Sequence, residues 1–291
     1  MKPTLCVFIG DTQCGSTTAL ALKDYELEEG RPYSLTRDQE WLTECWADAI
    51  NRVKACAVGH QVFVGFGAEA IDGSNHHGTT QTSGTPVNQV HMAVELCRPY
   101  FNMADECRAL TGTETHSGLE SEMDHLFAKE IGNVRCQPYW ALNISGRLLD
   151  WAHHGINVAQ NPVSELNGMN LAADKVYWRC KEKSLRVPDI IVRHHAHRSP
   201  RPIVRRGITV AVAGCWQLST AHGHRIAAGS PPDIGLLLWW PEAMGIERIV
   251  YDVPRGINYV RFSDRRSDAS GGLVRRGDVG DGGSSTPQEN P

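Results

Sequence analysis

The chain has 291 residues, a hydrophobic content of 41% and a formal net charge of −4 at pH 7. This length allows one large buried core. The slightly acidic net charge argues against a nucleic-acid scaffold with a strongly basic surface. No run reaches the roughly 18 consecutive apolar residues of a membrane span. The nine cysteines show no paired CxxC spacing, which predicts reduced thiols and a cytoplasmic protein.

The first part of the chain predicts a β-α-β unit. Thr4–Ile9 is an apolar run typical of a buried strand, Gln39–Ala57 has apolar residues at helical spacing, and Gln61–Phe66 predicts a second, parallel strand. Asp11 follows the first strand directly, where open α/β sheets place ligands. Asp11 can offer a carboxylate oxygen and Gln13 an amide oxygen to one centre, although a turn cap is the alternative reading of Asp11.

Polar residues also follow the next two strand ends. The loop after the second strand carries Glu69, Asp72, His76 and His77. A helix over Val87–Leu96 then precedes a short third strand, Cys107–Leu110, which Glu114 and His116 follow. A solvated loop explains any one of these side chains, but their repeated place after strands favours a common site.

A hairpin is predicted in the middle of the chain. Its strands are Tyr139–Ile144 and Leu148–Ala152, with a turn at Ser145-Gly146, and the second strand ends in His153-His154. We expect helices on both sides of this hairpin, over Leu119–Ile131 and Leu171–Lys183, and a loop over 157–170.

A histidine pair follows the strand Ile190–Val192. His195 and His197 are separated by one residue, and imidazole is a common ligand of first-row divalent metals. Two imidazoles just past a strand end can therefore reach one metal ion, whereas the alternative is an exposed turn in which histidines cluster. Arg198 beside them is a candidate phosphate contact or part of a solvated basic face.

The last predicted strands are Ile208–Gly214, Ile234–Trp240, Ile249–Val253 and Ile257–Phe262. From Ser267 onward the composition turns to Gly, Ser, Asp and Arg without a hydrophobic period. We therefore expect one catalytic domain over residues 1–266 and a disordered polar tail over 267–291.

The order of these strand-end residues resembles the calcineurin-like metallophosphoesterase superfamily, whose motifs run D-x-H, G-D, G-N-H-[DE], a strand-end H and G-H-x-H. The resemblance spans about residues 4–240. It looks closest to the phage and prophage-type branch through Ile71–Gln81 (IDGSNHHGTTQ), Gly112–His116 (GTETH) and His153–Gly155 (HHG). The implied fold is α/β, a four-layer β-sandwich of mixed sheets flanked by helices.

The resemblance implies two divalent metal ions, which we expect to be Mn, Fe or Zn because the ligands mix imidazole with carboxylate. Asp11 and His197 would hold the first ion, Glu69 would bridge, and His153 and His195 would hold the second. The full implied ligand set is Asp11, Gln13, Glu69, Glu114 (or Thr113 in its place), His153, His195 and His197. His116 would protonate the leaving oxygen, and the candidate substrate contacts are His76, His77, His154 and Arg198.

Four positions depart from the family pattern. Gln13 stands in place of the first-motif His, Ala68-Glu69 in place of G-D, Thr113-Glu114 in place of Asn, and His194 in place of the Gly before the paired histidines. A neutral amide is a weaker ligand than imidazole, and Glu carries its carboxylate one methylene further out than Asp. These changes favour a loosely held or single-metal site.

The activity that follows is metal-dependent phosphoester hydrolysis by a metal-activated hydroxide, of the phosphodiesterase or nuclease kind, with nucleic acid as a candidate partner. The alternative is a catalytically degenerate member that keeps the fold as a binding or structural module. A β-lactamase-like zinc nuclease is disfavoured because the sequence has no HxHxDH run.

The tail gives a first testable prediction. Residues beyond Ser267 offer too little apolar surface to offset the entropy of ordering them. A chain ending at Asp268 should therefore fold normally and keep its activity, as thermal unfolding and a phosphodiester assay can measure. A large loss of thermal stability on truncation would show that the tail is docked.

Overall fold

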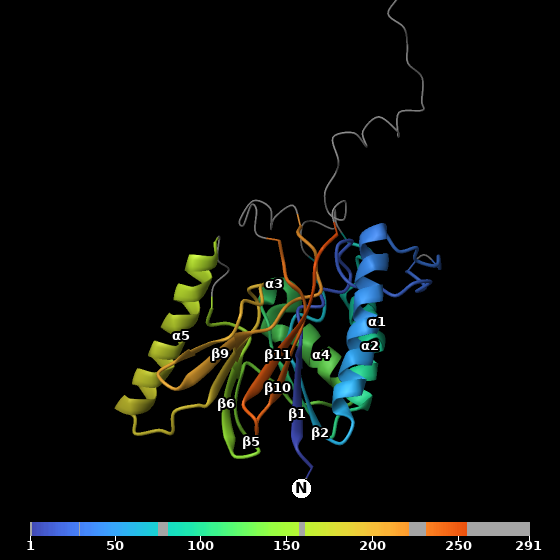
Figure 1. The fold of residues 1–291 in the computed structure, drawn as a ribbon. Helices are drawn as coiled ribbons and strands as arrows, with labels where there is room; N and C mark the ends of the chain where they lie inside the picture. The colour runs from blue at the N-terminus through green and yellow to red at the C-terminus, as the bar shows by residue number, and fades with distance from the viewer. Residues whose placement is uncertain (1, 29, 75–80, 157–160, 221–230, 255–291) are drawn as a thin grey trace, which may run out of the picture. The chain divides into compact units, whose positions relative to one another are not determined.

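Two mixed β-sheets form the fold of the computed structural model (Figure 1), which describes residues 2–28, 30–74, 81–156, 161–220 and 231–254. The first sheet contains β1 (Thr4–Ile9), β2 (Gln61–Phe66), β3 (Glu106–Leu110), β4 (Cys136–Gln137), β10 (Ile234–Trp240) and β11 (Gly245–Tyr251). The second contains β5 (Tyr139–Ile144), β6 (Arg147–Ala152), β7 (Ile190–Arg193), β8 (Ile203–Arg205) and β9 (Ile208–Val212). The strand orders are β11-β10-β1-β2-β3-β4 and β5-β6-β7-β9-β8.

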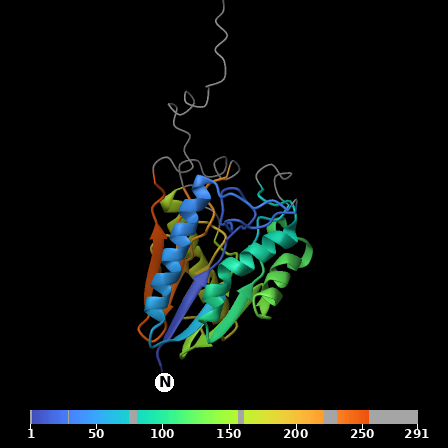
Figure 2. The same cartoon turned by 90° about the vertical axis from the view of Figure 1, so that its right-hand side faces the viewer.

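Helices cover the outer face of each sheet. They are α1 (Arg37–Ala57), α2 (Pro86–Asn102), the single turn α3 (Glu114–Ser117), α4 (Glu122–Glu130), which a 3₁₀ turn at Leu119–Ser121 precedes, and α5 (Pro162–Glu182). Figure 1 shows α5 beside the second sheet, and the turned view in Figure 2 shows α1 and α2 together over the first. The predicted four-layer α/β architecture is thus confirmed.

The alternation of side chains along the strands produces three cores. On β1, Leu5 and Val7 join the core under α1, α2 and α4, whereas Cys6 and Phe8 point into the core between the sheets. Ile191 of β7 joins a third core beneath α5. The central strands β1, β2, β7 and β10 are therefore buried on two faces, which explains why they are nearly continuous apolar runs rather than alternating ones.

Parallel pairing brings the functional strand ends to common edges. β1 pairs parallel with β2 and β2 with β3, while β6 pairs parallel with β7 and β7 with β9. The predicted hairpin is present as β5 and β6, with left-handed backbone at Ser145 (φ 51°) and Gly146 (φ 81°) in its turn. Loops that leave β1, β2, β6 and β7 can therefore meet above the sandwich.

Several predicted boundaries were wrong, among them the end of the helix expected at Leu96, which continues to Asn102 as α2. The helix expected at Leu171 begins at Pro162, because the Asn161 side chain accepts a hydrogen bond from the Ser164 N–H at 2.9 Å and Pro162 occupies the first turn, where no donor is needed. The last described strand, β11, begins at Gly245 rather than Ile249, since a short turn returns the chain antiparallel along β10.

Some predictions lie outside the described residues, namely the strand Ile257–Phe262 and the tail 267–291. No helix in the described part of the chain has the length and apolar character needed to cross a membrane.

The core between the sheets gives the second prediction. Phe8 is fully buried, and its ring centroid lies 5.7 Å from that of Trp151 and 6.2 Å from that of Phe63. Phe8→Ala should lower the free energy of unfolding by about 3–5 kcal/mol, since it leaves a cavity there. Chemical denaturation followed by circular dichroism measures the change. Val204→Ala on β8, where the side chain is 73% exposed, is the control, and an equal loss in both variants would contradict the assigned core.

Candidate metal centre

The loops that follow β1, β2 and β7 share an uncommon backbone. Six non-glycine residues there have φ angles between 48° and 75°, in the left-handed region: Asp11, Gln13, Ala68, Glu69, His195 and His197. Such backbone costs free energy and persists where the surrounding structure enforces it, often at functional sites. Here it turns the side chains of three strand ends toward one another.

The first group of ligand-type atoms comes from Asp11, Glu69 and His197, one atom of each lying within 4.8 Å of the others. Asp11 is 1% exposed, and neither of its carboxylate oxygens has a hydrogen-bond partner among the described residues. His197 Nε2 lies 3.6 Å from Asp11 Oδ1. Burial alone raises the pKa of Asp11, but the neighbouring histidines, His153 foremost, outweigh it and hold the pKa well below its usual range.

The second group consists of three imidazoles, His153, His154 and His195. Their ring centroids lie 4.5–5.2 Å apart. His153 Nδ1 donates to the Gly67 carbonyl oxygen at 2.6 Å, so its Nε2 is the atom that faces the site. A backbone carbonyl that fixes the ring in this way is the usual support for a metal-ligating histidine.

Glu69 connects the two groups. Its carboxylate is 1% exposed, and Oε1 lies 3.0 Å from His153 Nε2 and 3.8 Å from His195 Nδ1. Gln13 Nε2 donates to Oε2 at 2.7 Å, and Thr113 Oγ1 donates to Oε1 at 2.6 Å. Glu69 therefore belongs to the first group and lies close to two imidazoles of the second.

Of the two residues that stand where the family uses Asn, the structure brings Thr113 to the site. Thr113 precedes α3 and contacts Glu69, whereas Glu114 is the first residue of α3 and is exposed. Glu114 belongs to neither group of ligand atoms within the described residues. The helix start directs the two neighbouring side chains apart, a difference that residue type alone does not reveal.

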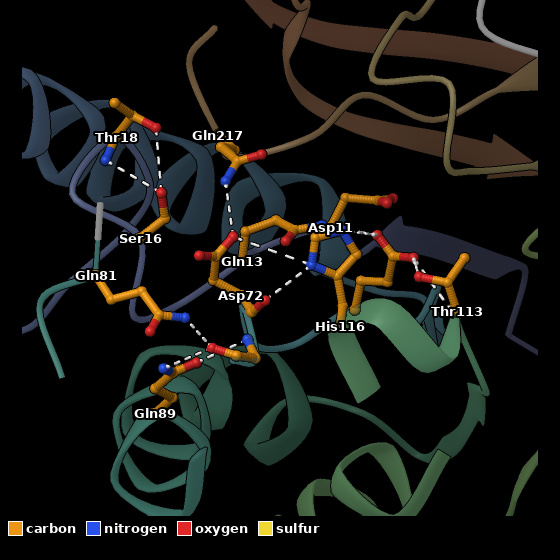
Figure 3. Close-up of polar contacts among 12 residues, drawn as sticks. Asp11, Gln13, Ser16, Thr18, Asp72, Gln81, Gln89, Thr113, His116 and Gln217 are labelled. Carbon is orange, nitrogen blue, oxygen red and sulfur yellow. Dashed lines mark hydrogen bonds and ion pairs between the residues drawn. The ribbon is translucent and has the colours of Figure 1, made fainter. Parts of the chain in front are cut away.

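His116 lies beside Asp72 (Figure 3). Its Nδ1 is 2.9 Å from the Asp72 carbonyl oxygen, which can only accept, so this nitrogen carries the proton. Its Nε2 faces Glu69 Oε2 at 3.9 Å. Gln217 donates to Asp72 Oδ1 at 3.4 Å, so Asp72, 2% exposed, is itself held in place.

The candidate substrate contacts fall in three places. His154 belongs to the imidazole group, and His76 and His77 lie outside the described residues. Arg198 donates from Nε to Glu165 at 2.8 Å and lies 3.6 Å from Asp233, so its guanidinium ties α5 to the segment before β10.

The donor set fits divalent first-row metal ions. Several buried atoms in it lack hydrogen-bond partners among the described residues: both Asp11 carboxylate oxygens, Gln13 Oε1, His153 Nε2 and His195 Nδ1. Orphaned buried polar atoms are costly, and mixed carboxylate, amide and imidazole donors suit Mn, Fe or Zn. The sequence alone assigns no role to two supports, Gly67 and His194, although His194 is a departure from the family pattern at the start of the run HHAH.

Comparisons with known proteins give distant likenesses. No protein-family model and no curated protein matches the chain. Among solved structures it is similar to an archaeal phosphodiesterase (10% identity, 85% of this chain and 99% of that chain, TM-score 0.43) and to a hypothetical protein from Pyrococcus horikoshii OT3 (10%, 90% and 92%, TM-score 0.46). A single mutant of Vps29 from Entamoeba histolytica is also similar (11%, 85% and 99%, TM-score 0.36). With TM-scores below 0.5, these likenesses carry no inference about activity.

The site predicts how the metal-free protein responds to pH. Burial lowers the pKa of His153, but Asp11 and Glu69 outweigh burial and raise it from 6.5 to about 9. A histidine whose pKa is raised on folding stabilises the fold below its unfolded pKa, and that stabilisation is lost as pH rises through the folded pKa. Thermal stability of chelator-stripped protein should therefore fall between pH 6.5 and 9.

His153→Gln should reduce this pH dependence but not abolish it, because Cys215 and Asp11 outweigh burial and also raise the pKa of His197. His154→Gln is the matched control, because burial and the neighbouring His153 and His195 lower the pKa of His154. Differential scanning calorimetry measures both variants, and a pH dependence as steep in His153→Gln as in the wild type would contradict the assignment.

Proposed function

We propose that this chain is a metal-dependent phosphoester hydrolase of the metallophosphoesterase type, acting on phosphodiesters, with nucleic acid as the first candidate substrate. The observation that carries the proposal is the pair of ligand groups connected by buried Glu69, whose members include oxygens and nitrogens without a hydrogen-bond partner among the described residues. The run Ile71–Gln81 supports the phage or prophage-type branch of that family, and with it activity in a host cytoplasm.

Two ions would share Glu69 and would otherwise be held by different donors. Asp11, Gln13 Oε1, Glu69 and His197 would hold one, and the second would be held by Glu69 with the three imidazoles His153, His154 and His195. When bound, such a pair of ions lowers the pKa of a water to supply hydroxide and neutralises charge on the phosphoester oxygens.

The chain's own residues would order this centre. Burial of Asp11 and Glu69 keeps bulk water away from the carboxylates and strengthens their charge interactions. The Gly67 carbonyl fixes His153 so that Nε2 faces Glu69. Gln13 donates its amide N–H to Glu69, which leaves the amide oxygen, Oε1, as the atom available for an ion.

His116 would be the general acid. The Asp72 carbonyl occupies its Nδ1–H, so Nε2 is the nitrogen directed toward the ligand groups. In the protonated ring, Nε2 would pass its proton to the leaving alkoxide.

One observation favours the alternative of a binding or structural module without turnover. Gln13 and Thr113 each donate a short hydrogen bond to Glu69, one to each carboxylate oxygen. A carboxylate has about four lone-pair sites, so both bonds are compatible with bridging, yet each draws electron density from a ligand that two ions would share.

Titration of activity with Mn²⁺ separates the two functions and tests Gln13. Because imidazole is a stronger ligand than an amide oxygen, Gln13→His should lower the Mn²⁺ concentration for half-maximal hydrolysis of bis-p-nitrophenyl phosphate by about 10-fold. Asp11→Ala and His197→Ala should lower activity by more than about 100-fold. Gln137→His, on an exposed residue of β4, is the matched control and should behave as wild type.

Single- and double-stranded DNA serve as the second substrates in the same assay. Metal content below about 0.2 ion per chain after reconstitution would count against the site itself. Inactivity of wild type and Gln13→His at every metal concentration, with metal bound, would support the binding module. Identical Mn²⁺ dependence in wild type and Gln13→His would show that Gln13 is not a ligand.

A further inference from the structure

Trp151 occupies a fixed position between the two sheets. It lies on β6, is fully buried and packs edge-on against Phe8 and Phe63. A Cβ at Gly65 would come within 3.0 Å of its ring carbons, so the glycine leaves room for the indole. The packing directs the only polar atom of Trp151, Nε1–H, toward the end of β7.

This indole N–H sets the protonation of His194. Nε1 of Trp151 donates to His194 Nε2 at 3.0 Å, and His194 is fully buried. An indole can only donate, so Nε2 of His194 must accept and carries no proton. The proton of the neutral ring therefore resides on Nδ1.

The Nδ1–H of His194 faces Asp11. The distance from Nδ1 to Asp11 Oδ2 is 3.6 Å, and both atoms are buried without a hydrogen-bond partner among the described residues. Gly67 makes the approach feasible, because a Cβ there would lie 2.0 Å from His194 Nδ1. Gln13 directs its amide N–H to Glu69 instead, so the ring N–H of His194 is the donor aimed at Asp11 Oδ2.

We propose that His194 is a positioning residue for Asp11: Trp151 locks it as the Nδ1–H tautomer, and this N–H orients the carboxylate so that Oδ1 faces His197 and the ligand group. The proposal rests on the metal-binding part of the proposed function. Outer partners that orient a ligating carboxylate typically change metal affinity 10–100-fold when removed. A glycine at position 194, which the family pattern would place there, could not supply such a donor.

The tautomer is tested directly on the metal-free protein. Nitrogen NMR of histidine-labelled protein, with His194 assigned by its absence in His194→Asn, should show the proton on Nδ1 and an unprotonated Nε2. Trp151→Phe should abolish this preference. A proton on Nε2 in the wild type would overturn the proposal, as would loss of the Nδ1 proton when Zn²⁺ is added, because His194 would then be a ligand itself.

The effect on metal affinity is tested by measuring Mn²⁺ binding with calorimetry, in the absence of substrate. Asn places an amide donor close to where His carries Nδ1–H, whereas Val has similar volume and no donor. His194→Val should weaken one Mn²⁺ site by about 10-fold or more, and His194→Asn should restore affinity to within about threefold. Equal affinities in the two variants would overturn the positioning role.

Trp151→Phe needs its own control because it also removes core volume. Trp140→Phe removes a second indole N–H near the same core, one that donates to the Ala109 carbonyl at 2.8 Å. Only Trp151→Phe should weaken Mn²⁺ binding, and equal weakening in both would overturn the link from Trp151 to Asp11. Since no readout requires turnover, a catalytically silent wild type would disprove hydrolysis while leaving this test intact.

Discussion

The buried carboxylate of Glu69 is the constraint on which the site depends. A charge removed from water is costly unless hydrogen bonds and opposite charge compensate it. Here an amide, a hydroxyl and an imidazole meet the two oxygens of Glu69, and they come from the ends of β1, β3 and β6. The three strands must therefore end in a defined register, so that the side chains in the loops after them reach Glu69.

The sandwich supplies the rigidity that the strained loops need. Left-handed backbone at Asp11, Glu69, His195 and His197 is unfavourable by itself, but each residue follows a strand that is buried on both faces. Large aromatic side chains between the sheets, Phe8 and Trp151 among them, fix the spacing of the two sheets. The core that stabilises the fold thus also sets the distance between the two ligand groups.

The two ligand groups differ chemically. One is rich in carboxylate and amide oxygen, and the other consists of three imidazoles, with Glu69 common to both through its contact with His153. Neutral donors such as Gln13 and His194 stand beside the carboxylates and support them by hydrogen bonding and orientation rather than by added charge. Ion occupancy in such a centre therefore depends on these neutral supports as well as on the ligands. Gln13 and His194 are also two of the positions at which the chain departs from the family pattern.

By itself, the sequence determined most of the strands, the hairpin, most helices and the placement of ligand-type residues after strand ends, because apolar periodicity and turn chemistry are local properties. Only the tertiary structure decided that α5 begins at Pro162, that Thr113 rather than Glu114 meets Glu69, and that Arg198 pairs with Glu165. The contact between His194 and Asp11 likewise joins residues far apart in the chain. Such contacts depend on how two sheets stack and where each loop turns, and no local pattern encodes either.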